Sequence, residues 1–192
     1  LHAGPLKQCS IIKTNQMYGA ELALEAARYF DKPLVARCGY MWSNNAAREA
    51  GYHSPQATLA RRVEEKVFNA AQRIFVTTEV MRNDVAERVP SAESRIHIVP
   101  NYVDTDVFKP LNFQRDANTL LFVGRIAPEK NLYSLLEAIR KLDVKLILIG
   151  EGKLRPILQD SYASDGRTIW EGTVPNNRLP EYMNRATIFV LP

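Results

Sequence analysis

The chain has few of the residues that build most metal sites and disulfide frameworks. Its 192 residues include two cysteines, Cys9 and Cys38, and three histidines. The two thiols do not have the spacing of metal ligands, and so small a number of cysteines favours a reducing compartment. We therefore predict a cytoplasmic protein without a metal site.

Long hydrophobic runs and blocks of one charge are also missing. The longest apolar stretches are strand-sized, far below the roughly 20 residues that a membrane-spanning helix needs. The formal net charge is +4, and no basic stripe alternates with aromatic residues, which argues against nucleic acid as a partner. Peripheral contact with the inner face of a membrane stays open, although no amphipathic basic helix supports it.

Signatures of common cofactors are absent as well. No Gly-x-Gly-x-x-Gly follows a predicted strand and no P-loop is present, which argues against a redox dinucleotide enzyme and against an NTPase. No pattern of serine, histidine and aspartate indicates a hydrolase, and His97 lies between two isoleucines of a predicted strand. We therefore predict no cofactor.

The sequence does contain a regular alternation of strand and helix patterns. Predicted strands cover residues 10–13, 33–37, 73–77, 96–99, 119–123, 144–149, 168–170 and 187–191. Predicted helices cover 18–30, 56–71, 79–88, 132–142, 154–161 and 177–184, and 40–54 is predicted as a loop. Strands that are joined by helices imply parallel sheets with right-handed crossovers. The predicted fold class is α/β, with two Rossmann-like domains.

An irregular, polar stretch divides the two domains. Residues 100–113 carry no periodic pattern, and Pro110 interrupts them, so this stretch is the predicted linker. We place one domain at 1–108 and the other at 109–192. The apolar run 188–192 reads as a buried strand with nothing after it to cover its sheet. We therefore expect both domains to be truncated parts of a longer protein.

The most informative segment is the one from Leu120 to Asn131. An apolar run stops at Gly124, Arg125 follows, and Lys130 comes just before a helical pattern opens. Ligands of α/β folds lie beyond the carboxyl ends of the strands, and a helix N-terminus there attracts anions. Two cations at that position suit a diphosphate, and Gly124 lets a phosphate approach the backbone.

Four blocks of the second half, in this order and spacing, resemble glycosyltransferase family 4, whose members have the two-domain GT-B fold. They are Phe122-Val123-Gly124-Arg125 with Lys130-Asn131, Leu148-Ile149-Gly150-Glu151-Gly152, Trp170-Glu171-Gly172-Thr173-Val174, and Ala186-Thr187-Ile188-Phe189-Val190-Leu191-Pro192. The segment from Ile98 to Phe108 is similar to the hinge motif of the family. The resemblance is specific from Arg73 to Pro192 and loose over the first 70 residues.

The resemblance implies transfer of a sugar from a nucleotide-diphosphate sugar to an acceptor hydroxyl, with retained configuration and without a metal. Arg125 and Lys130 would hold the donor diphosphate. Glu151 would lie near the donor, although it also suits the start of the following helix as a dipole partner. Gly172, Thr173 and Val174 would pack against the nucleotide base, although the glycine could equally meet the needs of a turn.

The resemblance also implies that the chain lacks some residues of the family's active site, and it does not identify the acceptor. The paired glutamates of the family follow the last strand and lie beyond Pro192, so the fragment alone is expected to be inactive. The acceptor is an unknown carbohydrate, lipid-linked or small molecule, and polar residues after the first strands could face it: Lys13, Asn15, Arg37, Tyr40 and Trp42. The alternatives are a non-catalytic, two-lobed module that binds a sugar or nucleotide, and a GT-B-type epimerase or phosphorylase.

Overall fold

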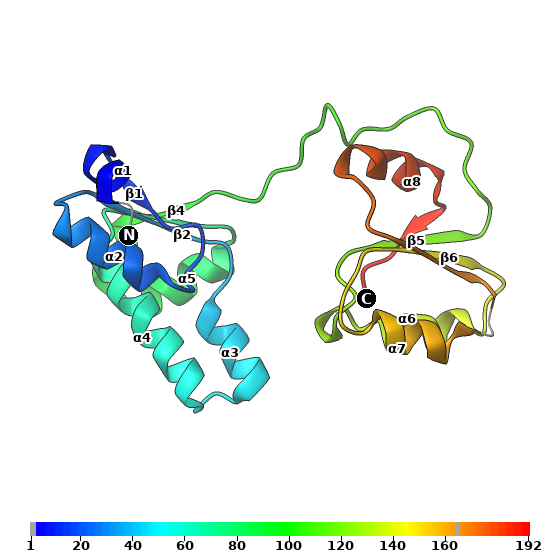
Figure 1. Ribbon diagram of the computed structural model, residues 1–192, viewed down its shortest axis with the longest axis horizontal. Coiled ribbons are helices and arrows are strands. Elements are labelled where there is room, and N and C mark those ends of the chain that lie inside the picture. Colours follow the sequence, from blue (N-terminus) through cyan, green and yellow to red (C-terminus); the bar gives the residue numbers. More distant parts are fainter. Residues whose placement is uncertain (1–2, 164–165) are drawn as a thin grey trace. The chain divides into compact units, whose positions relative to one another are not determined.

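The computed structural model describes residues 3–163 and 166–192, and the chain forms two compact units (Figure 1). The first unit is Leu1–Tyr102 and the second is Val103–Pro192. Between the last strand of the first unit and the first strand of the second, residues 99–118 form neither helix nor strand. Each unit has its own parallel sheet and its own core.

The first unit is a four-stranded parallel sheet in the order β1-β2-β3-β4. Its strands are β1 (Ile12–Lys13), β2 (Leu34–Cys38), β3 (Arg73–Val76) and β4 (Ile96–Ile98). Its helices are α1 (Ala3–Gln8), α2 (Ala20–Tyr29), α3 (Trp42–Ala50), α4 (Pro55–Ala70) and α5 (Glu79–Arg88), and a 3-10 turn spans Pro90–Arg95. The sheet and helices enclose a core that includes Met17, Leu34, Phe68 and Ile74.

Local sequence signals explain where two of these helices begin. Thr78 precedes α5, and its side chain accepts a hydrogen bond of 3.2 Å from the Met81 N–H, as the sequence predicts. Ser54 does the same for α4 by accepting from the Ala57 N–H, and Pro55 occupies the first helical position. Capping satisfies N–H groups that have no partner within the helix.

The second unit is a four-stranded parallel sheet in the order β7-β6-β5-β8. Its strands are β5 (Thr119–Val123), β6 (Lys145–Ile149), β7 (Thr168–Gly172) and β8 (Ile188–Phe189). Its helices are α6 (Leu132–Ile139), α7 (Arg155–Ser161) and α8 (Leu179–Arg185), with 3-10 turns at Pro128–Lys130 and Asn176–Arg178. Helices α6 and α7 lie on one face of the sheet and α8 on the other (Figure 1).

The order of the second sheet reverses between β5 and β8. The chain adds β6 and β7 on one side of β5 and then crosses to place β8 on the other side. Open parallel sheets bind ligands in the crevice that forms where the strand order reverses, beyond the carboxyl ends of the strands. The residues that leave β5 at this point are Gly124 and Arg125.

The predicted α/β class with two parallel sheets is confirmed, but the prediction of a loop over 40–54 is wrong. Residues Trp42–Ala50 form α3, although serine and asparagine in its first turn favour helices little. Ala46 and Ala47 pack against Ala57 and Ala60 of α4. This small-residue contact between two helices is a tertiary feature, which local periodicity does not report.

Two further details of the first unit differ from the sequence prediction. The helical spacing of Leu59 with Val63 and Val67 predicts that it faces the core, but Leu59 is exposed, and α3 instead packs on Ala57 and Ala60 of α4. Helix α1 was not predicted; its six residues include a glycine and a proline, and none of them is buried.

We expect the Cys38 thiol to react only when the protein unfolds. Burial, with the Glu64 carboxylate as a second cause, raises the pKa of Cys38 from 9.0 to about 12. Ellman's reagent at pH 8 should therefore modify the half-buried Cys9 in the native chain and both thiols in urea. Because the pKa of Cys38 is higher in the folded chain, the thiol deprotonates at a lower pH in the unfolded chain. The protonated Cys38 thiol therefore makes its full contribution to folding stability below pH 9, and this contribution is lost as the pH rises from 9 to about 12. A Cys9→Ser variant that reacts in the native state would contradict this expectation.

Candidate functional site

Three loops meet at the carboxyl edge of the second sheet. The Gly124 N–H donates to the Ile149 carbonyl at 2.9 Å, and the Ile126 N–H donates to the Glu151 carbonyl at 2.9 Å. The loop after β7 joins them, because the Gly150 N–H donates to the Gly172 carbonyl at 2.7 Å. These main-chain bonds bring the loops of three predicted site residues, Gly124, Glu151 and Gly172, to one place.

Two glycines permit this close meeting of loops. A Cβ on Gly150 would lie 1.9 Å from the carbonyl oxygen of Gly124, and a Cβ on Gly152 would lie 2.2 Å from that of Ile126. Gly150 also has a φ of +137°, which side chains rarely adopt. The sequence prediction did not include either glycine among the site residues, although the Gly-Glu-Gly pattern after a strand was the available signal.

Both predicted cations belong to the single loop that leads from β5 into α6. Arg125 follows Gly124, its side chain is 77% exposed, and its guanidinium forms an ion pair of 2.9 Å with Glu129. Lys130 is half-buried and ends the 3-10 turn, and Asn131 then adopts a left-handed conformation from which α6 starts. The loop therefore presents a guanidinium and an ammonium five residues apart, next to the point at which the strand order reverses. Their catalytic role stays a prediction.

Glu151 has a structural partner. Its carboxylate pairs with Arg155, the first residue of α7, and Arg155 also donates to the Trp170 carbonyl of β7 at 3.2 Å. Glu151 and Arg155 thus tie the loop after β6 to strand β7. This contact supports the interpretation of Glu151 as a partner at the helix start, while its carboxylate stays partly exposed at the same edge.

The predicted base-binding turn begins at Gly172, the last residue of β7. Gly172 is buried with a φ of +75°, and a Cβ there would lie 3.2 Å from a Glu151 carboxylate oxygen. Thr173 is exposed, and Val174 packs against the cluster that contains Leu121. The turn itself thus requires the glycine, while Thr173 is exposed to solvent. Contact with a nucleotide base stays a prediction.

The linker contains an Asp-x-Asp sequence, Asp104-Thr105-Asp106, which bears on the prediction of no metal site. The Asp106 N–H donates to the Asp104 carboxylate at 3.0 Å, so this carboxylate closes a local turn. Within residues 3–163 and 166–192, no group of three or more histidine, cysteine, aspartate or glutamate side chains is placed to hold a metal ion. Independence from metal stays a prediction.

Polar residues also gather at the carboxyl edge of the first sheet. The Arg37 guanidinium donates to the Asn15 carbonyl at 3.2 Å and to the Asn101 side chain at 3.1 Å, so it links the ends of β1, β2 and β4. Trp42 stacks edge-on against Tyr18, with ring centroids 5.1 Å apart. Sequence reasoning singled out Arg37 and Trp42 and missed Tyr18.

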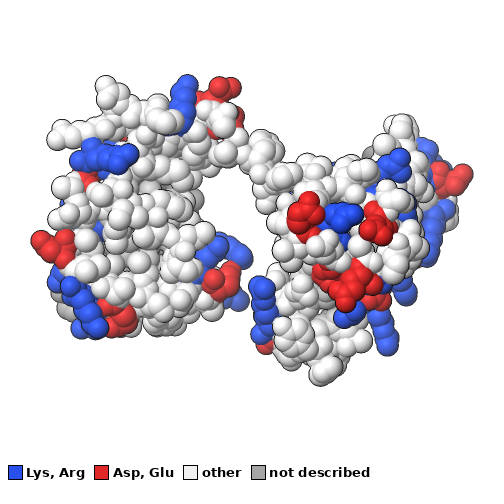
Figure 2. Space-filling model, turned by 180° about the vertical axis from the view of Figure 1, so that it is seen from behind, with Lys and Arg blue, Asp and Glu red and all other residues white. Residues whose placement is uncertain are grey.

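The face shown in Figure 2 has charges of both signs on its surface. On the side shown in Figure 2, lysine and arginine are interspersed with aspartate and glutamate on both units. Among the helices of the described residues, none combines the length and apolar character that crossing a membrane requires.

Comparisons with known proteins agree with these observations. Residues 4–107 match the family model described as Glycosyltransferase Family 4, and residues 103–192 match that described as Glycosyl transferases group 1. The alpha-maltose-1-phosphate synthase of Mycolicibacterium smegmatis is 28% identical over 154 residues, which cover 68% of this chain and 40% of that protein.

Two solved structures have a similar fold. Anabaena HepE in complex with UDP has a TM-score of 0.77 at 13% identity, over 97% of this chain and 54% of HepE; HepE has also been solved with UDP-glucose. The sucrose-phosphate synthase of Thermosynechococcus elongatus has a TM-score of 0.79 at 18% identity, over 100% of this chain and 51% of that one. At this identity the likeness shows the fold alone. The chain spans about half the length of these two structures and 40% of the length of the alpha-maltose-1-phosphate synthase.

Proposed function

Because the chain belongs to glycosyltransferase family 4, we propose that it forms part of the donor site of a sugar-transferring enzyme. The donor is a nucleotide-diphosphate sugar, the sugar is a hexose, and the accepting group is a hydroxyl. The observation that carries the proposal is the strand order β7-β6-β5-β8. It places the point of reversal at the end of β5, where Gly124 and Arg125 leave the sheet.

The loop suits a diphosphate leaving group. Breaking the bond between sugar and phosphate leaves negative charge on the nucleoside diphosphate, and fixed cations stabilise that charge as it develops. Arg125 offers a planar fork for phosphate oxygens, and Lys130 offers a compact charge. The exposed ion pair between Arg125 and Glu129 contributes at most about 1 kcal/mol, so a diphosphate can displace the carboxylate.

We propose further that transfer retains the anomeric configuration and needs no metal, because the arginine and the lysine neutralise the diphosphate. Uridine nucleotides are the first donors to test, since HepE binds UDP and UDP-glucose. Transfer should continue in excess EDTA, and proton NMR of the product should show the anomeric configuration of the donor. Loss of transfer in EDTA that Mg²⁺ restores would contradict the metal-free mechanism and direct attention to Asp104 and Asp106.

Replacing Arg125 or Lys130 with alanine should lower the turnover of the complete gene product by about 10²–10³-fold, as loss of a single charge-stabilising donor does in other enzymes. The measurement is release of nucleoside diphosphate with time at saturating donor. Arg140→Ala is the matched control. Arg140 follows the C-terminus of α6, the end opposite Lys130, and forms an exposed ion pair with Glu137 of the same helix. Turnover within threefold of the unmodified protein in both variants would rule out the proposed role. Nucleotide binding without any turnover would favour a non-catalytic module.

A further inference from the structure

A concave site lies in the first unit, which does not contain the proposed donor loop, residues 124–131. It is a cavity of about 420 Å³, within the size range of pockets for small ligands, about 300–1,000 Å³. Its lining consists of Tyr18, Tyr40, Trp42, Asn45, Ala46, Glu49, Ala50 and Gln56. Tyr18 and Tyr40 follow β1 and β2, so this part of the lining lies on the carboxyl side of the first sheet, where parallel sheets bind ligands.

Side-chain hydrogen bonds hold the two loops that carry these tyrosines. The Thr14 hydroxyl donates to the Arg37 carbonyl at 3.1 Å and accepts from the Arg37 N–H at 2.9 Å. The Gln16 side chain accepts from the Gly39 N–H at 3.0 Å. The loop before Tyr18 is thereby fixed to the end of β2, so the cavity is largely formed before any ligand arrives.

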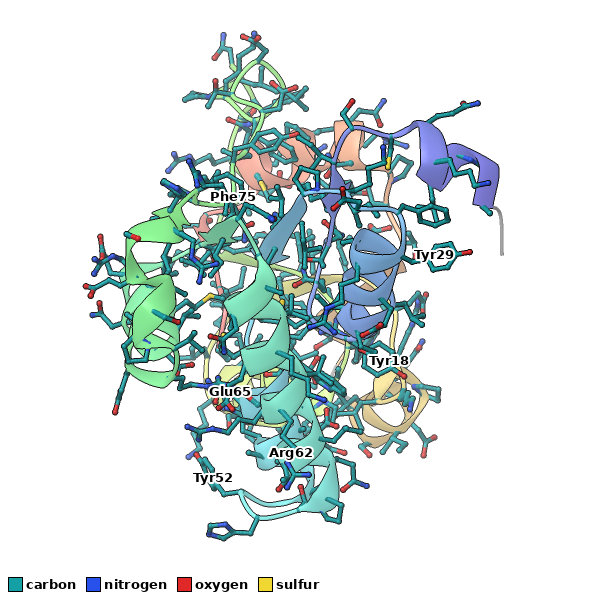
Figure 3. The ribbon with its side chains drawn as sticks, turned by 90° about the vertical axis from the view of Figure 1, so that its left-hand side faces the viewer. Tyr18, Tyr29, Tyr52, Arg62, Glu65 and Phe75 are labelled. Carbon is teal, nitrogen blue, oxygen red and sulfur yellow. The ribbon has the colours of Figure 1, made fainter. Side chains whose placement is uncertain are left out.

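An aromatic pair forms one wall of the cavity. Trp42 packs against the main core and against the alanine contact between α3 and α4, which fixes its indole ring. Tyr18 stands edge-on to that ring at an interplanar angle of 86°, and it is 74% exposed. Figure 3 shows Tyr18 beside the first turn of α2. A large aromatic side chain held in place at this exposure offers an apolar face to a ligand.

Beside the aromatic rings and two alanines, three polar residues line the cavity, and only one of them is charged. Asn45 and Gln56 contribute amides, which both donate and accept hydrogen bonds, and Glu49 contributes a carboxylate. Glu49 is the one charged residue among those that line the cavity, and no lysine or arginine joins it. Amides beside aromatic rings suit a ligand with apolar C–H faces and a rim of hydroxyls, and the lone carboxylate disfavours a phosphate.

We propose that this cavity binds an uncharged pyranose ring of the acceptor, so that the acceptor is a neutral saccharide. The inference rests on the proposed transfer function and specifies the substrate class of its acceptor side. It excludes a phosphorylated sugar and a simple lipid alcohol as the group that occupies the cavity. The C–H face of the pyranose stacks on the exposed ring of Tyr18, its edge contacts Trp42, and Asn45, Glu49 and Gln56 bind its hydroxyls.

The chain allows a direct binding test. Its two tryptophans are Trp42 and Trp170, so a Trp170→Phe variant leaves Trp42 as the one indole reporter. Methyl glucoside, methyl galactoside, methyl mannoside and methyl N-acetylglucosaminide are titrated to millimolar concentration, with glucose 6-phosphate and octanol for comparison. We expect a saturable fluorescence change and saturation-transfer NMR signals with at least one neutral glycoside, and neither with the phosphorylated sugar or the alcohol.

Variants in the β1–α2 loop, on α2 and on α4 test whether the cavity, and not another part of the surface, binds the glycoside. Tyr18→Ala and Gln56→Ala should each weaken glycoside binding by about tenfold, whereas Tyr29→Ala should leave it unchanged. Tyr29 is the matched control, because it ends α2, is 82% exposed and does not line the cavity. Equal binding by Tyr18→Ala and Tyr29→Ala, preference for glucose 6-phosphate, or no binding of any glycoside would overturn the inference. Glycoside binding in a protein that neither binds nor consumes a nucleotide sugar would instead refute the transfer function and leave the saccharide site standing.

Discussion

Replacing Arg88 with methionine is expected to destabilise the first unit by about 3–5 kcal/mol. Arg88 is only 5% exposed, and its guanidinium donates to the fully buried Glu64 carboxylate at 2.7 Å. The same carboxylate accepts from the Ser43 hydroxyl at 2.6 Å and from the Ser43 N–H at 3.0 Å. Without Arg88, the buried Glu64 carboxylate keeps its two hydrogen bonds from Ser43 but loses its counter-ion. A buried charge without a counter-ion lowers folding stability more than the loss of the whole pair does.

The measurement is urea unfolding followed by the fluorescence of Trp42 in the Trp170→Phe background. Arg28→Met provides the control, because Arg28 forms an exposed pair with Glu25 and should change stability by no more than about 0.5 kcal/mol. The double variant Glu64→Gln with Arg88→Met removes both charges, and it should recover much of the loss. A single Arg88→Met variant as stable as Arg28→Met would show that the buried pair does not hold this unit together.

The same network explains why the sequence did not reveal α3. Its first turn contains Ser43 and Asn44, which favour caps and turns over helix interiors. Glu64, which binds Ser43, lies 21 residues further along the chain. In the sequence, Glu64 has the pattern of an exposed polar position on an amphipathic helix. Its burial beside Arg88 depends on the contact of α4 with α5 and is known only from the structure.

Elements that depend on local signals were predictable. The apolar run of β5 matches its predicted range, Thr119–Val123, because a strand buried in a parallel sheet needs a continuous apolar segment. The Thr78 cap of α5 was likewise predictable, because capping joins residues only three positions apart. The alternation of such elements was sufficient to predict two parallel sheets.

The two proposed binding sites differ in how much of them the sequence could reveal. The donor loop is one continuous segment, so the spacing of Arg125 and Lys130 was visible, although the pairing of Arg125 with Glu129 was not. The proposed saccharide cavity joins residues of the β1–α2 loop, of the β2–α3 loop, of α3 and of α4. Tyr40 and Trp42 were noticed because they follow a strand. Tyr18 is identified as part of the proposed site only by its edge-on contact with Trp42 in the folded chain.

Replacing Gly150 with alanine is expected to damage the donor side of the molecule by displacing main chain. The added methyl would lie 1.9 Å from the Gly124 carbonyl oxygen. This oxygen belongs to the main chain, so it cannot move away by a side-chain rotation. The φ of +137° adds strain for any residue with a Cβ. Overpacking and backbone strain together should reduce the stability of the second unit by about 2–5 kcal/mol.

Gly166→Ala separates the two causes. Gly166 also has a positive φ, +63°, but an added methyl there meets nothing within 4 Å, so this variant should lose only about 1–2 kcal/mol from strain. Thermal unfolding of the two variants measures the difference, and titration with UDP measures its effect on the site. Since the methyl of Gly150→Ala pushes directly on the residue before Arg125, we expect UDP affinity to fall in that variant while Gly166→Ala binds normally. Equal stability and equal UDP binding in the two variants would show that the contact between Gly150 and Gly124 does not shape the donor loop.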